Sequence, residues 1–330
     1  MLRSRIIGVG AHTPKRVLSN LDLEKMVDTN DEWITSRSGI KERRIAGEDE
    51  TTSDLAAAAT LRALEMAGMR ADEIELIVLG TASPDMPLPS TACHLQRKIG
   101  ASKAACFDVG AGCSGFLYAL SVADKFVRTG SVKNAVVVGV EILSKFINWK
   151  DRGTCILFGD GAGVAILRGE EAKDAKSPGV LSTHIHSDGN GWNLIMIPGG
   201  GTANPPSQRV LDEGLQYIHM QGKETFKIAV KSLAEVAGEA LAFNGMTNED
   251  ITHLISHQAN KRIIDAVVDR VGLSPDKVHM NLDRYGNTSA ASIPITLDEA
   301  VRNGRIKPGD VMLMTAFGAG LTWASAIARW

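Results

Sequence analysis

The sequence is poor in aromatic residues, which make up 5% of its 330 residues. It also has no excess of basic charge, because 36 Lys and Arg residues are balanced by 38 Asp and Glu residues. Proteins that bind nucleic acids use basic patches and stacked aromatic side chains. The composition therefore argues against a nucleic-acid-binding protein.

Cysteine is scarce as well, and no two of the four cysteines form a CxxC pair. Metal sites and disulfide frameworks usually need closely spaced cysteines, so we expect neither here. No apolar run approaches the ~20 residues that a membrane-spanning helix needs. Residues 1–8 also lack the long apolar region of a signal peptide. We therefore expect a cytoplasmic protein without a membrane segment.

What the sequence does contain is a repeated pattern. Residues 61–78 and 237–255 each read as a helix, a Gly-Met stop, an acidic turn and an apolar strand. Helix–glycine–strand units also recur by chance in α/β proteins. We interpret the repeat as two halves, 1–172 and 173–330, related by a pseudo-two-fold axis.

A second match pairs two polar turns that precede helical stretches. Cys113 and Asn287 lie equally far before Gly130 and Gly304, the glycines that end these stretches. The alignment predicts that Cys113 and Asn287 occupy equivalent positions at the openings of two helices. Two helix N-termini would then meet near the pseudo-two-fold axis.

Apolar strands alternate with helical stretches along the chain. Residues 74–79 and 135–140 are apolar almost throughout, which is typical of strands buried on both faces of a layered α/β fold. Residues 187–214 differ, because they contain a PGGG run and a Pro-Pro pair. We interpret this segment as a loop-rich insertion or lid.

Cys113 stands in the sequence Gly-Ala-Gly-Cys-Ser-Gly-Phe, between a strand-like run and a helical one. A helix N-terminus favours a thiolate, which predicts a nucleophilic cysteine. The neighbouring glycines would allow a tight turn and the close approach of a substrate. A buried structural cysteine is the plain alternative.

Two further polar clusters follow expected strands. His257 comes directly after the strand 251–255, and Asn287 opens the run Asn-Thr-Ser-Ala-Ala-Ser. Ligands gather at the carboxyl ends of strands in open α/β sheets. Alone, His257 would more often be structural and Asn287 a helix N-cap. With Cys113 they make a plausible three-residue site.

Together these stretches resemble the ketoacyl-ACP synthase III enzymes of the thiolase superfamily, over essentially the whole chain. Six segments carry the resemblance: 31–40, 108–116, 151–163, 257–260, 285–294 and 317–323. The resemblance implies an α/β duplicated thiolase fold, with αβαβα layers in two pseudo-two-fold-related halves, and a homodimer.

The resemblance assigns catalysis to Cys113, His257 and Asn287. Cys113 would accept the acyl group of an acyl-CoA primer. Malonyl-ACP, the malonyl thioester of acyl carrier protein (ACP), would lose CO2 to form an enolate held by His257 and Asn287. The backbone N–H groups of Cys113 and Ala319 would form a second oxyanion site. Neither a metal nor a redox cofactor is implied.

The residue set also narrows the subclass. Degradative thiolases need a second cysteine as a base, and no cysteine follows Cys155. Elongating synthases use two histidines, whereas this chain has a histidine and an asparagine. Enzymes of the chalcone synthase type share the triad, but their other sequence stretches are less similar to this chain.

The resemblance implies substrate contacts position by position. The implied CoA-binding residues are Trp33, Arg37, Arg152 and Asn260. The implied acyl-pocket residues are Phe158 and Leu88, the latter reaching the pocket of a partner subunit. Leu88 replaces a frequent Phe, which suggests room for a longer or branched primer. The implied docking residues for acyl carrier protein are Lys227, Arg262 and Arg270.

Three alternatives stay open from the sequence. One is a specialised relative that condenses or transfers acyl groups in secondary metabolism. Another is a nucleotide-binding α/β protein, although no complete GxGxxG follows the first strand. The third is an inactive homologue that only binds acyl-CoA, which the intact triad disfavours.

Overall fold

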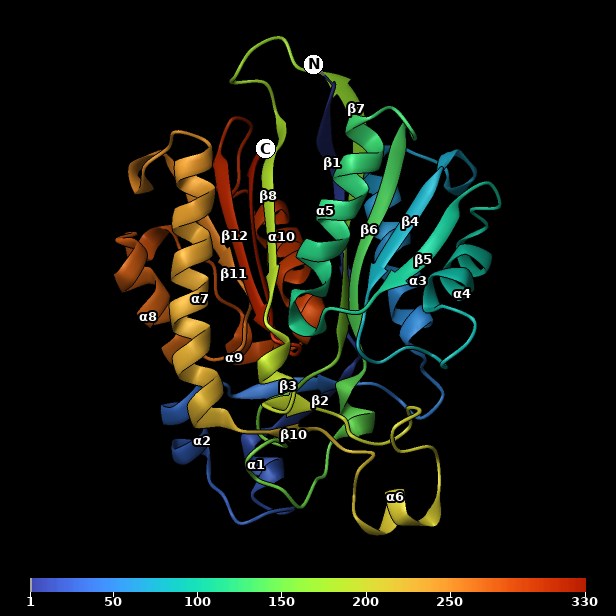
Figure 1. Ribbon diagram of the computed structural model, residues 1–330, viewed down its shortest axis with the longest axis vertical. Coiled ribbons are helices and arrows are strands. Elements are labelled where there is room, and N and C mark those ends of the chain that lie inside the picture. The colour runs from blue at the N-terminus through green and yellow to red at the C-terminus, as the bar shows by residue number, and fades with distance from the viewer. Residues whose placement is uncertain (1) are drawn as a thin grey trace.

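The computed structural model describes residues 2–330 and contains two main sheets with helices between and around them (Figure 1). The first sheet has five strands in the order β1-β7-β6-β4-β5. These strands are β1 (Leu2–His12), β4 (Leu76–Gly80), β5 (Ala105–Val109), β6 (Asn134–Glu141) and β7 (Gly161–Glu171). Strands β4, β5 and β6 run parallel, and β7 is antiparallel to both of its neighbours.

The second sheet repeats this plan. Its order is β8-β13-β12-β11, formed by β8 (Gly179–Ser187), β11 (His253–Ser256), β12 (Val311–Gly318) and β13 (Thr322–Arg329). The pairs β8–β13 and β13–β12 are antiparallel and β12–β11 is parallel, as for their counterparts. A single parallel bridge between Leu254 and Val278 stands where β5 has its place in the first sheet. The predicted duplication is therefore visible in the topology.

Two helices lie between the sheets, α5 (Gly115–Arg128) and α10 (Ser292–Arg302). The largest core cluster joins them to both sheets, with Phe116 and Leu297 from the helices and Val137 and Met314 from the strands. Each fully buried side chain of this size contributes about 1.5–3 kcal/mol by leaving water.

Outer helices complete five layers. Helices α3 (Thr52–Ala67) and α4 (Thr91–Ile99) cover the first sheet, and α7 (Gly222–Phe243) and α8 (Lys261–Val271) cover the second. The expected glycine stops are present, because Gly68 and Gly245 have positive φ angles of 61° and 62° just after α3 and α7. The αβαβα layering is confirmed. The exact boundary at 172/173, between β7 and β8, stays a prediction.

Short elements gather at one end of the layers (Figure 1). They are β2 (Arg16–Ser19), β3 (Glu42–Ile45), β9 (Ile195–Met196), β10 (His219–Met220), α1 (Asn20–Leu23), α2 (Asp31–Ser38), α6 (Gln208–Asp212) and α9 (Leu282–Tyr285). Residues 187–214 contain little regular structure beyond β9 and α6, as the sequence predicted. No helix within residues 2–330 is both long and apolar enough to cross a bilayer.

Candidate active site

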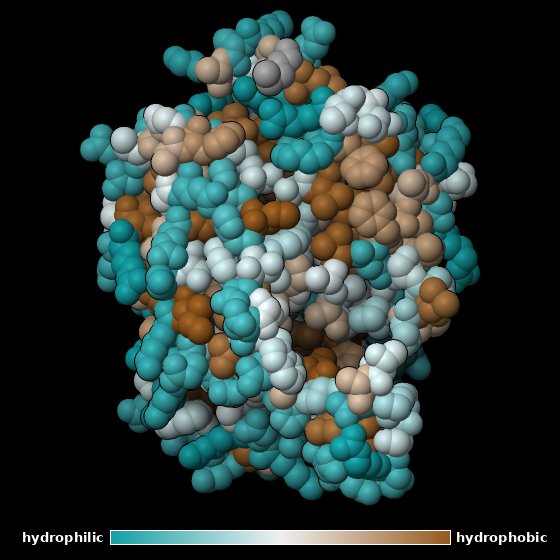
Figure 2. Space-filling view, viewed as in Figure 1, coloured by the Kyte–Doolittle hydropathy of each residue, from teal (hydrophilic) through white to brown (hydrophobic). Residues whose placement is uncertain are grey.

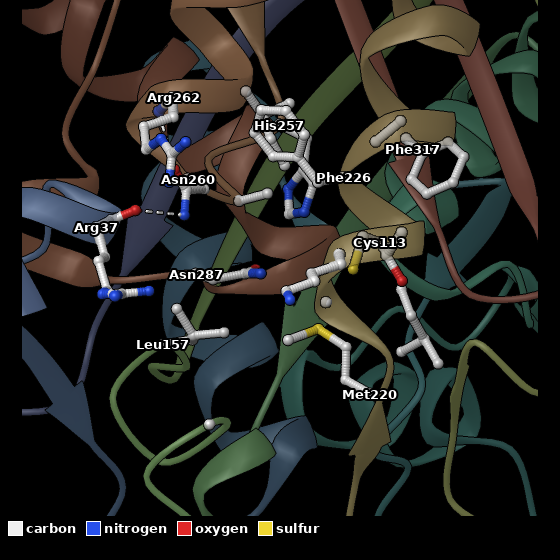
Figure 3. A pocket seen from close by; sticks show the side chains of 18 of the residues that line it. Arg37, Cys113, Leu157, Met220, Phe226, His257, Asn260, Arg262, Asn287 and Phe317 are labelled. Carbon is white, nitrogen blue, oxygen red and sulfur yellow. Dashed lines mark hydrogen bonds between the residues drawn. The ribbon is translucent and has the colours of Figure 1, made fainter.

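A cavity of about 720 Å³ opens among these short elements and reaches the ends of both sheets. Cys113, His257 and Asn287 line it together, and Figure 3 shows their side chains directed at one space. They come from three distant parts of the chain, so the fold assembles them. The volume lies within the range of about 300–1,000 Å³ that is usual for small-molecule sites.

Cys113 lies in a single 3₁₀ turn, η2 (Gly112–Ser114), between β5 and α5. Gly112 has a φ of 49°, a value that favours glycine. The end of β12 packs directly against the turn, since a Cβ atom on Gly318 would lie 2.4 Å from the Cys113 nitrogen. The sharp turn predicted around the cysteine is present, and it depends on glycine on both sides of this contact.

The surroundings of Cys113 act on the protonation of its thiol in opposite directions. Burial raises the pKa of the thiol to about 11, and the negative charge of Glu141 adds to this rise. A hydrogen bond from Ser289 acts in the opposite direction. Loss of solvation therefore opposes the thiolate form that the helix N-terminus favours.

His257 follows β11, and its backbone N–H donates to the Thr315 carbonyl at 2.8 Å. Burial lowers the pKa of the imidazole to about 4, so the ring is neutral at neutral pH. Its Nδ1 lies 2.7 Å from Ser292 Oγ, which also accepts the Gln258 N–H at 3.3 Å. This arrangement favours donation from Ser292 to Nδ1, which leaves Nε2–H as a donor toward the cavity.

Asn287 is fixed by its backbone and its side chain. Its N–H donates to the Leu157 carbonyl at 2.8 Å, and its carbonyl accepts the Gly159 N–H at 3.1 Å. Its Oδ1 accepts the Ser289 N–H at 2.8 Å. The amide is thereby oriented with Nδ2 available as a donor.

Asn287 does not open a helix as the sequence repeat predicted. A turn, η7 (Ser289–Ala291), intervenes, and α10 begins only at Ser292. The reason is the hydrogen bond that the Ser289 N–H donates to Asn287 Oδ1, which holds a local turn in place of a helical one. The asparagine therefore lies beside the cysteine without matching its position exactly.

The backbone of Ala319 lies next to Cys113. A Cβ atom on Gly112 would lie 2.8 Å from the Ala319 nitrogen. Thr322 ties this loop to the turn, since its hydroxyl donates to the Ala111 carbonyl at 2.8 Å. The structure thus brings together the two backbone groups that the resemblance assigned to the second oxyanion site.

Glu141 was not predicted from the sequence. It ends β6, is fully buried, and accepts hydrogen bonds from Ser83 Oγ at 2.5 Å and Ser289 Oγ at 3.0 Å. Burial raises the pKa of its carboxyl to about 7. The available signal was one acidic residue at the end of an otherwise apolar strand.

The cavity mouth carries three of the predicted CoA-binding residues. The guanidinium carbons of Arg37 and Arg152 lie 4.7 and 5.1 Å from the centre of the Trp33 ring. Arg152 also donates to the Asp28 carbonyl at 3.0 Å. Trp33 and Arg37 line the cavity, and Arg152 lies beside them over the indole ring of Trp33.

Asn260 also lines the cavity, but both ends of its amide are occupied. Its Oδ1 caps α8 by accepting the Arg262 N–H at 2.8 Å, and its Nδ2 donates to the Arg37 carbonyl at 3.0 Å (Figure 3). The side chain therefore holds α8 against the end of α2.

The predicted basic residues separate into two groups. Lys227 and Arg262 line the cavity, and Arg262 lies 5.6 Å from the centre of the Phe226 ring. Arg270 is in the last turn of α8 and does not line the cavity. Lys223, which was not predicted from the sequence, adds another cation to the lining.

The two predicted acyl-pocket residues also differ. Phe158 is buried, lines the cavity and forms a parallel bridge with Asn287. Leu88 is 84% exposed and does not line the cavity of its own chain. Its role in the pocket of a partner subunit stays a prediction. No group of three or more His, Cys, Asp or Glu side chains within residues 2–330 could hold a metal ion.

Comparison with known proteins agrees with this geometry. Two family profiles match, 3-oxoacyl-[acyl-carrier-protein (ACP)] synthase III over residues 107–189 and its C-terminal region over 241–330. Beta-ketoacyl-[acyl-carrier-protein] synthase III of Caldanaerobacter subterraneus is 52% identical over 325 residues, 98% of this chain and 97% of that protein. The enzyme of the same name from Xanthomonas campestris is 50% identical over 99% of this chain and 98% of that protein.

Solved structures give the same result. The crystal structure of 3-oxoacyl-[acyl-carrier-protein] synthase III from Aquifex aeolicus superposes with a TM-score of 0.91 at 45% identity, covering 99% of this chain and 100% of that one. The Thermus thermophilus enzyme gives a TM-score of 0.90 at 42% identity, with 99% of each chain covered. The chain therefore belongs to the beta-ketoacyl-ACP synthase III family of acyltransferases, which have the thiolase fold.

Proposed function

We propose that this chain catalyses the condensation that starts fatty acid synthesis, joining an acyl-CoA primer to malonyl-ACP. The products are 3-ketoacyl-ACP, CoA and CO2. The observation that carries this proposal is the convergence of Cys113, His257 and Asn287 in one cavity with a basic, aromatic mouth. A thiol nucleophile beside two neutral hydrogen-bond donors suits this chemistry.

The first half-reaction is acyl transfer to Cys113. Its sulfur attacks the thioester carbonyl, and the C–S bond to CoA then breaks. The oxygen of the tetrahedral intermediate needs donors as it gains charge, and the adjacent backbone N–H groups of Cys113 and Ala319 can supply them. Backbone donors tolerate any side chain, so alanine suits the second position.

The second half-reaction begins with decarboxylation of malonyl-ACP. The electron pair of the breaking C–C bond moves into the thioester, whose oxygen becomes negative. His257 Nε2–H and Asn287 Nδ2–H act as donors to that oxygen. A neutral imidazole is the better partner here, because a protonated ring would trap the enolate by giving up its proton. The enolate carbon then attacks the acyl group on Cys113.

The mouth is proposed to bind the carriers. Trp33 offers a face for the adenine, and Arg37 and Arg152 offer charge for phosphate groups. Lys227 and Arg262 are proposed to meet the acidic carrier protein. Arg270 is a more distant candidate for the same surface.

Primer selection is proposed to depend on Phe158 and on Leu88 of a partner subunit. We therefore propose a homodimer, and the unpaired edge of strand β5 supports this proposal. Within residues 2–330 this edge strand pairs on one side only, and the ring of its Phe107 lies 6.4 Å from that of Phe126 on α5. Figure 2 shows hydrophobic side chains at the surface over α5 and toward β5. No metal or redox cofactor enters the proposed steps, and a cytoplasmic location remains part of the proposal.

One observation favours a second candidate. The priming beta-ketosynthase of the R1128 polyketide pathway superposes with a TM-score of 0.91 at 36% identity, covering 99% of this chain and 96% of that one. A role in priming a polyketide would use the same residues with another carrier. An inactive acyl-CoA-binding homologue is disfavoured, because the three reactive side chains are present and converge.

The test is product formation with purified components. The protein is mixed with malonyl-ACP and, in parallel, acetyl-, isobutyryl- and octanoyl-CoA, and the ACP products are identified by mass. Ketoacyl-ACP formed on a fatty acid carrier supports the proposal, whereas product formed only on a polyketide carrier supports the second candidate. A strict preference for acetyl-CoA would argue against the wider pocket that Leu88 suggests.

A further inference from the structure

Glu141 is a buried carboxylate that the steps above do not use. Within residues 2–330 its hydrogen-bond partners are three hydroxyls and one backbone N–H, with no cation among them. They are Thr81 Oγ1 at 3.3 Å, the Ala82 N–H at 3.1 Å, Ser83 Oγ at 2.5 Å and Ser289 Oγ at 3.0 Å. A buried charge held only by neutral donors is costly unless the group can also be protonated.

Ser289 connects this carboxylate to the nucleophile. Its hydroxyl donates to Glu141 at 3.0 Å, and its side chain is close enough to Cys113 to lower the pKa of the thiol. Ser289 is the one non-glycine residue within residues 2–330 that has a positive φ, at 48°. Such a conformation costs energy and persists only where the surroundings enforce it, which is common at functional sites. This backbone conformation sets where the Ser289 hydroxyl lies beside Glu141.

The chain from Cys113 through Ser289 to Glu141 can hold one proton in two ways. With Glu141 ionised, Ser289 donates to the carboxylate and accepts from the thiol. With Glu141 protonated, the carboxyl donates to Ser289, and Ser289 donates to the thiolate. Every polar group keeps a partner in both states, so the proton can pass without leaving a buried group unpaired.

We propose that Glu141 accepts the proton of Cys113 through the Ser289 hydroxyl during acyl transfer and returns it during condensation. In acyl transfer the Cys113 S–H bond breaks, a bond forms between sulfur and the acyl carbon, the bond from that carbon to CoA sulfur breaks, and Glu141 gains the proton. The CoA thiolate leaves and is protonated by water. This inference rests on the proposed function.

Condensation reverses the proton transfer. Malonyl-ACP loses CO2, its electron pair forms the new C–C bond, and the bond between the acyl carbon and Cys113 breaks. The departing thiolate takes the proton back from Glu141 through Ser289. The malonyl carboxylate brings in one negative charge. Glu141, which was neutral before condensation, carries one negative charge afterwards, so the charge balances.

The protonation preferences of the site fit this sequence. The pKa of the thiol is raised to about 11 and that of the Glu141 carboxyl to about 7, whereas that of His257 is lowered to about 4. Near neutral pH the carboxylate is therefore the better-matched base. Cys113 on η2 is the titratable group that faces it, and its contacts from η7 and from residues 81–83 are uncharged. Glu141 is neutral when the malonyl anion arrives, which removes a repulsion.

The test compares acylation with thiol reactivity in Glu141→Gln. Acylation is measured as a single-turnover rate constant, by intact mass after mixing with acyl-CoA at pH 7. Thiolate formation is measured by iodoacetamide labelling of Cys113 across pH. Loss of the carboxylate charge should shift labelling to lower pH, yet acylation should slow by ~10²-fold, the size of a general-base contribution.

The opposite directions of these two changes distinguish a proton acceptor from a structural residue. Acylation at or above the wild-type rate would overturn the proposal, and so would a parallel loss of labelling and acylation. Ser289→Gly is the second variant, because glycine suits a φ of 48° and keeps the N–H that holds Asn287. It should also acylate ~10²-fold more slowly, without the rate inflection near pH 7 expected of wild type.

Wild type and Cys113→Ala are run beside these variants. Wild type that no acyl-CoA can acylate would overturn the proposed function itself. Acylated wild type together with an unimpaired Glu141→Gln would overturn only the proton relay.

Discussion

At the scale of single residues, burial sets which groups carry charge in the site. It keeps His257 neutral by lowering the pKa of its imidazole, and it raises that of the Glu141 carboxyl toward neutrality. The hydrogen bonds of Ser292 and Ser289 then direct the imidazole and the Asn287 amide. The residue types were evident from the sequence, but their protonation states depend on burial that only the fold supplies.

Removing either enolate donor should separate the two half-reactions. His257→Ala and Asn287→Ala are each expected to lower the rate of ketoacyl-ACP formation by ~10²–10³-fold, as for loss of one oxyanion donor. Acylation of Cys113 should change far less, because neither donor acts on that carbonyl. The measurement is acyl-enzyme mass beside product formation. Equal loss of both steps would contradict the assigned role.

Glu141 should also shape the dependence of stability on pH. Its native pKa of about 7 lies above the ordinary 4.5, so the native state binds more protons between these values. Stability is therefore lost as pH rises through this window, by about 3 kcal/mol at 1.36 kcal/mol per pKa unit. His257 has the opposite effect at lower pH, but it is present in both proteins compared below.

Glu141→Gln removes this pH-dependent contribution to stability, because glutamine does not titrate. The melting temperature of the variant minus that of wild type is expected to rise from pH 5 to pH 8, whatever the constant cost of the substitution. Thermal unfolding at several pH values measures it. A difference that stays flat or falls with pH would show that the carboxyl is not raised in the native state.

At the scale of elements, the active site depends on how closely two backbones approach. The turn before α5 and the end of β12 touch at Cys113 and Gly318. The sequence predicted both turns from their glycines, and the strand–turn–helix order around Cys113 was correct. The contact between the turns joins residues far apart in the chain, so no local pattern could predict it. The same holds for the turn that delays α10 after Asn287.

Gly318→Ala should therefore impair activity strongly. Its new Cβ would meet the Cys113 nitrogen at 2.4 Å. This contact forces the loop that carries the Ala319 N–H away from the nucleophile. We expect product formation to fall by at least ~10²-fold, the cost of one lost oxyanion donor. Steady-state kinetics measure the change.

Gly110→Ala is the matched control, because nothing in residues 2–330 lies within 4 Å of its Cβ position although it precedes Cys113 in the same turn region. It should keep near-wild-type activity. Similar losses in the two variants would mean that glycine is needed here for another reason.

At the scale of the whole molecule, duplication brings the site together. The two sheets share strand order and direction, and α5 and α10 pack between them, so the two turns meet at one end. The repeated Gly-Met stops made this duplication predictable. The cavity was less predictable from the sequence. Part of its lining comes from β9, β10 and α7, which contribute Ile195, Met220 and Lys223, and none of these residues belongs to a recognisable motif. The buried carboxylate was missed because its only signal was one charged residue at a strand end.

The basic mouth should distinguish carrier docking from primer binding. Arg262→Glu places negative charge at the cavity opening and is expected to raise KM for malonyl-ACP about tenfold, with little effect on acylation by acyl-CoA. Arg270→Glu is the matched control on the same helix, about 12 Å farther along at 1.5 Å per residue, and should act more weakly. A larger effect at Arg270 would move the docking surface away from the cavity.

The most direct test of the proposed reaction is the mass of the intact protein after mixing with acyl-CoA, followed by malonyl-ACP. Acyl transfer to Cys113 predicts a gain equal to one acyl group on wild type, no gain on Cys113→Ala, and loss of that group when malonyl-ACP is added. Acylation that survives in Cys113→Ala, or an acyl group that malonyl-ACP does not remove, would contradict it.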